Sequence, residues 1–349
     1  MTPGIELHGR ANATLAVARP EEPVERVADE SVELSSLDLY LQAFPVPWAG
    51  LLVEVEVESE LENEAREVEV DPELLLLELR PLQNESLRLR LGYAPLPFGL
   101  ERRYYAPPRN VLANRPAVFR RVFPGTASDV GAWVWGVLDL GLLGGSLELE
   151  AGAFRGLTGP TREDVPAFED GDTNDEPQFS GRLAWTLAEH DPNAPNASGL
   201  LADVPVGLRL TIGASLLFGH YDRAARRRLL LHGFDGELAL GGLRVRFEYV
   251  ARWFEIRRAP DLRGEGHYAL VSYTHRFGWT GLEDLSVAVR YGRMDPDRRV
   301  RDAFDLERIH VGLAWTPVEG LLVKVGYEWG RAPGRLRPRT LYLEAGYSF

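Results

Sequence analysis

The sequence predicts an all-β fold, a 16-stranded antiparallel transmembrane β-barrel that residues 1–349 form as a single domain. Apolar and polar residues alternate along almost the whole chain, which is the pattern of strands with two different faces. The connections between these stretches alternate between short and long. The last stretch, residues 340–349, reads as a strand that ends on an aromatic residue, whereas the ends of soluble domains are usually polar and frayed. A last strand that meets lipid and pairs with the first strand explains this ending.

The alternation defines sixteen strands, an even number, as expected when both chain ends lie on one side of a membrane barrel. From Leu243 to Trp253, for example, apolar residues occupy every odd position, and arginine or glutamate occupies most even positions. The predicted strands are residues 5–19, 31–44, 51–62, 67–80, 85–95, 128–139, 145–156, 177–188, 206–220, 227–241, 242–256, 265–278, 282–294, 305–317, 319–331 and 337–349. The stretch 188–205 is long where the pattern predicts a short turn.

Composition and motifs argue against several other classes of protein. The chain has no cysteine, so it has neither disulfides nor a cysteine metal site. No run approaches the roughly 18–20 apolar residues of a membrane-spanning helix. The histidines are scattered, with no His-Glu-x-x-His or Gly-x-Ser-x-Gly motif, and these motifs mark common hydrolytic sites. We therefore expect no catalytic residues, no cofactor and no nucleic-acid partner.

Acidic residues are concentrated in the first quarter of the chain. Residues 1–80 contain 19 acidic residues and 5 arginines, whereas the rest of the chain contains 33 acidic and 34 basic residues. In residues 51–62, glutamates alternate with valines. If the valines meet lipid, the glutamates face the lumen, because carboxylates are unfavourable on the lipid side. The predicted acidic lumen wall consists of Glu54, Glu56 and Glu58.

Parts of the sequence resemble the phosphate-selective porin O and P family of bacterial outer-membrane channels. The segment Leu89–Glu101 contains Gly92 and then Pro97-Phe98-Gly99-Leu100-Glu101, which is similar to a Gly-x-x-x-x-Pro-Phe-Gly-Leu-Glu pattern of that family. Residues 175–184, 233–235, 247–250 and 268–273 are also similar, and the likeness extends over residues 85–349. The resemblance implies a sixteen-stranded homotrimeric porin of the bacterial outer membrane, in contact with lipid and lipopolysaccharide.

In porin-type barrels, the connection between the fifth and sixth strands folds inward and narrows the pore. Here this connection, residues 96–127, is the longest one and has no acidic residue after Glu101. We expect it to be an inward-folded third extracellular loop that also covers the apolar inner face of Leu74–Leu77. Arginine stays charged and exchanges partners with passing anions. The predicted pore constriction consists of Arg102, Arg103, Arg109, Arg115, Arg120 and Arg121. Alternatively, these arginines pair with lumen carboxylates or bind lipopolysaccharide phosphates.

Strand parity also places basic residues on the lumen side. The predicted lumen-facing set is Arg88, Arg90, Arg182, Arg244, Arg246 and Lys324, the last being the only lysine in the chain. A basic lumen raises the local concentration of anions. The predicted function is therefore passive diffusion of small hydrophilic or anionic solutes, with a weak anion preference. A largely structural or adhesive barrel with an occluded lumen and a soluble all-β binding protein are the alternatives.

An acidic loop before the eighth predicted strand is a weak candidate for a metal site. Asp170, Asp172 and Asn174 offer oxygen ligands of the kind that Ca²⁺ prefers. The loop lacks the glycine and the distal glutamate of an EF-hand loop. A solvated loop without a metal is the favoured interpretation.

Overall fold

The structure is a computed structural model of the chain. It describes residues 4–19, 30–33, 37–62, 65–82, 86–101, 110–116, 118, 128–140, 145–156, 176–188, 207–221, 227–256, 260–279, 282–299, 305–318, 320–331 and 339–348. Within these ranges, no helix is long and apolar enough to cross a membrane.

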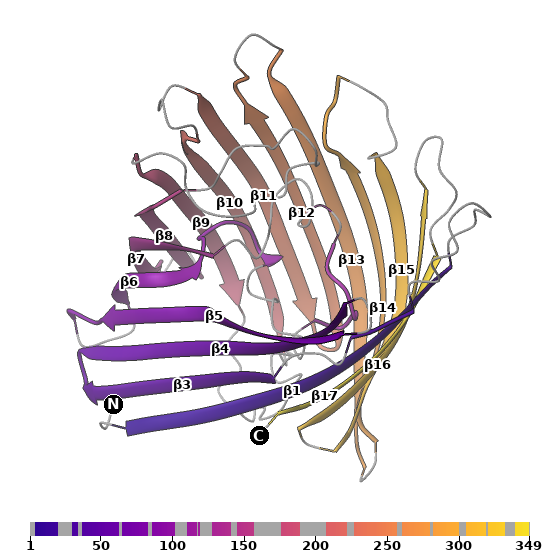
Figure 1. Ribbon diagram of the computed structural model, residues 1–349. Coiled ribbons are helices and arrows are strands. Elements are labelled where there is room, and N and C mark those ends of the chain that lie inside the picture. Colours follow the sequence, from indigo (N-terminus) through magenta and orange to yellow (C-terminus); the bar gives the residue numbers. More distant parts are fainter. Residues whose placement is uncertain are drawn as a thin grey trace.

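The described chain consists almost entirely of β-strands (Figure 1). Their bounds are β1 Gly4–Arg19, β2 Glu30–Glu33, β3 Leu37–Val46, β4 Ala49–Glu62, β5 Ala65–Leu79, β6 Leu87–Pro95, β7 Ser128–Asp139, β8 Ser146–Phe154, β9 Gln178–Ala188, β10 Leu208–His220, β11 Arg228–Leu240, β12 Leu243–Phe254, β13 Leu262–Trp279, β14 Leu282–Asp295, β15 Leu306–Val318, β16 Leu321–Arg331 and β17 Arg339–Ser348.

The strands form a closed antiparallel ring. From β3 to β17, each strand pairs with the strand that follows it in the sequence. Strand β1 closes the ring, because residues 10–19 pair with β17 and residues 4–11 pair with β3. Residues 14–17 of β1 pair with β2, so β2 and β3 share one place beside β1. The ring therefore has sixteen positions, and Figure 1 shows β1 running beside β17.

All sixteen predicted strands are confirmed, with ends that shift by a few residues. The predicted strand 31–44 corresponds to β2 and β3, and residues 34–36 between them lie outside the described residues. The pairing of β4 with β5 shifts register between Glu54 and Val55, opposite Glu73. This irregularity is a β-bulge, which inserts one extra residue into a strand and locally breaks the alternation of its faces.

The outer face of the ring is apolar and exposed. On most strands, every second residue is a large apolar side chain with much of its surface open, including Leu216, Phe234, Phe247, Val271, Val289, Leu313, Val325 and Leu343. The residues between them are mostly buried, and many are charged; on β12, for example, Arg246 and Glu248 flank the exposed Phe247. This distribution is the inverse of a soluble protein and matches a barrel whose outer surface lies in hydrocarbon.

The interior contains an apolar cluster as well as charged residues. Leu96, Phe98, Val111 and Leu112, which all come from the connection after β6, are buried in it together with wall residues of β10–β13. Figure 1 shows the chain after β6 turning to the inside of the ring. Leu76 is also part of this cluster, so an apolar inner face of β5 is covered, as the sequence predicts. Burial of each such side chain contributes about 1.5–3 kcal/mol.

Candidate functional site

The candidate site is the connection between β6 and β7, which is fixed to the inner wall at two places. The first place, the proximal anchor, is Pro97–Glu101. Glu248 on β12 accepts hydrogen bonds from two consecutive backbone amides, at 3.0 Å from Leu100 N and 3.1 Å from Glu101 N. Ser215 on β10 accepts a third from Gly99 N, at 2.9 Å. Side chains of the wall thus accept hydrogen bonds from three backbone N–H groups that are not part of the β-sheet.

Glycine is required at the centre of the proximal anchor. Gly99 has φ +70°, a conformation that costs other residues energy because of their Cβ atom. A Cβ at this position would lie only 2.0 Å from the Glu248 carboxylate oxygen. The Pro-Phe-Gly-Leu-Glu segment therefore has a physical role, since its glycine lets the chain approach the wall closely enough to be held.

Glu101 ends the proximal anchor inside the barrel. Its carboxylate accepts a hydrogen bond from the Tyr268 hydroxyl at 3.0 Å, and the side chain is buried. Burial raises the pKa of Glu101 above its ordinary value, and the charges of Arg246, Arg290 and Arg115 oppose this rise. The folded state therefore binds the Glu101 proton more tightly than the unfolded state does.

This difference predicts a pH-dependent stability. Between the ordinary pKa of 4.5 and the higher folded pKa, the folded state holds more protons, so Glu101 lowers the free energy of unfolding as pH rises through this interval. In Glu101→Gln this contribution is absent, and stability is expected to fall less steeply with pH. Denaturant unfolding of both proteins in lipid vesicles at several pH values measures the two slopes. Parallel curves would contradict the prediction.

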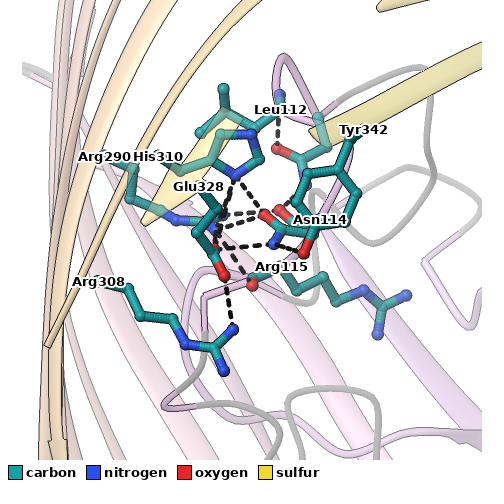
Figure 2. A network of polar contacts seen from close by, with 9 residues as sticks. Leu112, Asn114, Arg115, Arg290, Arg308, His310, Glu328 and Tyr342 are labelled. Carbon is teal, nitrogen blue, oxygen red and sulfur yellow. Dashed lines mark hydrogen bonds and ion pairs between the residues drawn. The ribbon is translucent and has the colours of Figure 1, made fainter. Parts of the chain in front are cut away.

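The second place, the distal anchor, centres on Asn114 (Figure 2). The Asn114 amide nitrogen donates to Glu328 on β16 at 2.8 Å and to the Tyr342 hydroxyl on β17 at 2.9 Å. Arg290 on β14 donates to the side-chain oxygen of Asn114 at 2.6 Å and to its backbone carbonyl at 2.7 Å. The ring of His310 on β15 contacts the same side-chain oxygen and stacks on Tyr342. One asparagine thus joins four wall strands.

Together the two anchors hold the connection across the inside of the ring. The proximal anchor bonds to β9, β10, β12 and β13, since the Ser180 hydroxyl also donates to the Pro97 carbonyl at 3.3 Å. The distal anchor bonds to β14, β15, β16 and β17. The predicted inward-folded loop is confirmed, and its anchored parts form a fixed section of the inner wall.

Of the six arginines predicted for the pore constriction, the structure describes Arg115. Its backbone carbonyl accepts a hydrogen bond from Arg290 at 3.2 Å, and its side chain is partly exposed. Figure 2 shows this side chain extending away from the Asn114–Glu328 contact. The other five, Arg102, Arg103, Arg109, Arg120 and Arg121, lie outside the described residues.

The six basic residues predicted to face the lumen all form ion pairs with carboxylates. Arg182 pairs with Asp235 through two contacts, and the other closest contacts are Arg88–Glu78 at 3.5 Å, Arg90–Glu78 at 3.0 Å, Arg244–Glu237 at 3.8 Å, Arg246–Glu237 at 2.8 Å and Lys324–Glu344 at 2.7 Å. Much of the positive charge on the wall is therefore balanced within the wall. Only part of it is left to act on a passing solute.

Two acidic residues of β4 are less buried than the carboxylates of these pairs. Glu54 and Glu56 are partly exposed and share a face opposite the exposed Leu51, while the side chain of Glu58 lies outside the described part. The weak calcium candidates Asp170, Asp172 and Asn174 also fall outside it. Within the described ranges, no group of three or more His, Asp or Glu side chains is placed to hold a metal ion.

The proximal anchor lies in stretches that the sequence marked only by family resemblance, whereas the residues of the distal anchor were not singled out from the sequence. Asn114 lies in a segment without periodicity, and its partner Glu328 is 214 positions away. Glu248 and Glu328 carried one available signal, namely that each is a carboxylate at a lumen-facing position of a strand. Strand parity assigns such a residue to a face but does not identify its partner.

No protein-family model and no curated protein matches this sequence. Solved structures do match. An anion-selective porin from Comamonas acidovorans has a TM-score of 0.64 at 10% identity, covering 99% of this chain and 100% of that one. OmpF of Salmonella typhi, in complex with daunomycin, has a TM-score of 0.64 at 11% identity, covering 99% and 97%. In-vitro folded OmpT of Vibrio cholerae, in a trimer form, has a TM-score of 0.59 at 11% identity, covering both chains fully.

These similarities and the geometry above define the class of fold. The chain is a sixteen-stranded transmembrane β-barrel with a loop folded into it, and its fold is similar over almost its whole length to those of the proteins just named. At 10–11% identity, the likeness establishes the fold, while function is argued from the site.

Proposed function

We propose that this protein is a porin of the bacterial outer membrane, a water-filled channel through which small hydrophilic solutes diffuse passively. The observation that carries the proposal is the loop anchored by Glu248 and Asn114 inside a closed, lipid-compatible barrel. Hydrogen-bonding the loop to the wall restricts the lumen while keeping it lined by charged side chains, an arrangement that selects solutes by size and charge. Nothing in this role calls for catalysis or a cofactor.

The proposed partners follow from the two surfaces of the barrel. The apolar outer face contacts membrane lipid, and the basic residues of the long connections contact lipopolysaccharide phosphates. We propose a homotrimer, since early strands with exposed apolar residues, such as Ile5 and Leu7 on β1, offer a face for a second copy. The Vibrio cholerae protein named above, which shares the fold, forms a trimer.

For the charge preference, we propose a weak selectivity for anions. It rests on the six arginines of the loop and on carboxylates that each hold more than one arginine, such as Glu78 and Glu237. The resemblance of the segment around Gly99 to phosphate-selective porins favours the same sign of preference. High phosphate specificity is not proposed, because the single lysine, Lys324, is buried against Glu344.

An occluded, structural or adhesive barrel is the second candidate. It is favoured by the apolar cluster inside the ring, in which Phe98, Leu112 and Tyr268 are almost completely buried. A lumen filled by such packing would pass no ions, whereas a porin keeps a wet path beside it.

Current through planar lipid bilayers distinguishes the two candidates. Protein that migrates as a folded, heat-modifiable species is expected to insert in discrete steps of open-channel conductance. In a KCl gradient, the zero-current potential is expected to have the sign of a mild anion preference. Boiled protein in the same detergent is the control. Folded protein without conductance would support the occluded barrel. A zero-current potential of cation-selective sign would contradict the anion preference, but the proposal that the protein is a porin would stand.

A further inference from the structure

Glu328 is shared by two arginines of different exposure. Arg290, whose side chain is 5% exposed, lies 3.5 Å from Glu328 Oε2. Arg308, whose side chain is 26% exposed, donates to Glu328 Oε1 at 2.6 Å. Oε2 also accepts the amide of Asn114. One carboxylate therefore faces two guanidinium groups.

The donors of Arg308 are only partly used. The structure gives this guanidinium one hydrogen bond, from Nη1 to Glu328, and its Nε is buried without a hydrogen-bond partner. A guanidinium has five N–H donors in a fixed fork, and burying one of them unsatisfied is costly. Because Nε is buried, the donors that remain for an acceptor from outside the wall are those of the terminal nitrogens Nη1 and Nη2.

Arginines also share a carboxylate at Glu78 and at Glu237, but there the most exposed side chains, Arg90 at 19% and Arg244 at 15%, are less exposed than Arg308. Lys324 and Glu344 form a pair in which both side chains are almost fully buried, at 1% and 5%. Arg276 is more exposed than Arg308 but pairs with Asp284, at 3.1 Å, which no other arginine contacts among the described ion pairs. Among the described ion pairs in which arginines share one carboxylate, Arg308 is the most exposed arginine.

Its place in the barrel brings Arg308 to the mouth. It is the third residue of β15, and Glu328 lies near the end of β16, so both are close to the long connections at one end of the barrel. Arg308 shares parity with the buried His310 and therefore belongs to the inner face. Figure 2 shows Arg308 and Arg115 both extending from the network on the side away from His310. A solute entering from this end would meet Arg308 before it passes the anchored loop.

We propose that Arg308 forms an oxyanion subsite at the mouth of the channel, which transiently binds the phosphate or carboxylate group of an entering solute. Arg290 and Asn114 hold Glu328 in place, and Glu328 orients the Arg308 guanidinium through one edge. The remaining edge is directed to the ligand, in the bidentate manner in which arginine recognises oxyanions. The subsite deepens the proposed porin function and rests on it.

The test compares wild type with Arg308→Gln, Arg308→Lys and the control Arg276→Gln in planar bilayers. The readouts are the zero-current potential in a KCl gradient and the inhibition of chloride current by inorganic phosphate or by acetate, added separately on the side of the long connections. In R308Q, the anion-to-cation permeability ratio is expected to fall about two-fold, and half-inhibition by phosphate is expected to need about ten-fold more ligand, the loss of one charged hydrogen bond.

The other variants separate charge from geometry. R308K is expected to keep the permeability ratio but to weaken phosphate inhibition, because an ammonium lacks the fork. R276Q is expected to match wild type in both readouts. Inhibition by phosphate and not acetate assigns the subsite to phosphate groups, and inhibition by both assigns it to oxyanions in general. A conducting wild type whose inhibition is unchanged in R308Q and R308K would overturn the subsite but keep the porin, whereas a wild type without current would overturn the porin itself.

Discussion

Arginine in place of Val289 is expected to destabilise the folded barrel by about 2–4 kcal/mol. Val289 lies in the middle of β14, is 45% exposed on the outer face and pairs with Val271 and Val311 on the neighbouring strands. In hydrocarbon, a guanidinium at this depth loses its hydration and finds no acceptor. Equilibrium unfolding by guanidinium chloride in lipid vesicles measures the loss.

Val289→Leu is the matched control, because it keeps an apolar side chain on the same face, and it is expected to stay close to wild type. The effect of the arginine should also depend on depth and be weaker near the ends of the strand. Equal stability of V289R and V289L would show that this face does not lie in hydrocarbon, and the inside-out assignment of the strands would then be wrong.

Methionine in place of Lys324 is expected to cost about 3–5 kcal/mol, since it leaves the charge of Glu344 buried after its ion pair is lost. The two groups lie 2.7 Å apart, and both are almost fully buried. Replacing both, in Lys324→Met with Glu344→Leu, is expected to recover most of the loss, because a buried ion pair can be exchanged for apolar packing at little net cost.

The double-mutant comparison is read from unfolding free energies in vesicles, with E344L as the fourth protein of the cycle. A strong positive coupling supports a pair that is buried in the folded state. If the effects of the single changes simply add, Lys324 and Glu344 are hydrated from the lumen, and the inner wall at β16 and β17 is wetter than the structure indicates.

The architecture was accessible from sequence because a membrane barrel repeats one physical rule. A stretch such as residues 243–253 must be apolar on one side and is free to be charged on the other, so period-two alternation locates strands, faces and the closing pair. The bulge at Glu73 was not predicted, because it depends on the pairing of two particular strands. The inward loop was predicted from its length and from family resemblance.

The internal contacts were much less accessible. Parity placed Arg246 and Arg244 on the inner face but gave no reason to join both to Glu237. The anchors at Glu248 and Asn114 connect residues more than a hundred positions apart, and no local pattern encodes such a distance. Loop arginines were noticed because they are charged, whereas the asparagine that holds the loop is a single uncharged residue in an aperiodic segment.

The pairing of β1 with β17 also constrains how the molecule is made. The strand synthesised first finds its permanent neighbour only when the last strand has been delivered, so contacts between opposite ends of the polypeptide complete the sheet, and such non-local contacts form slowly. Until then both margins carry unpaired amides and carbonyls, which hydrocarbon does not tolerate. Biogenesis of this chain therefore requires that its two edge strands be shielded until β1 and β17 pair and close the barrel.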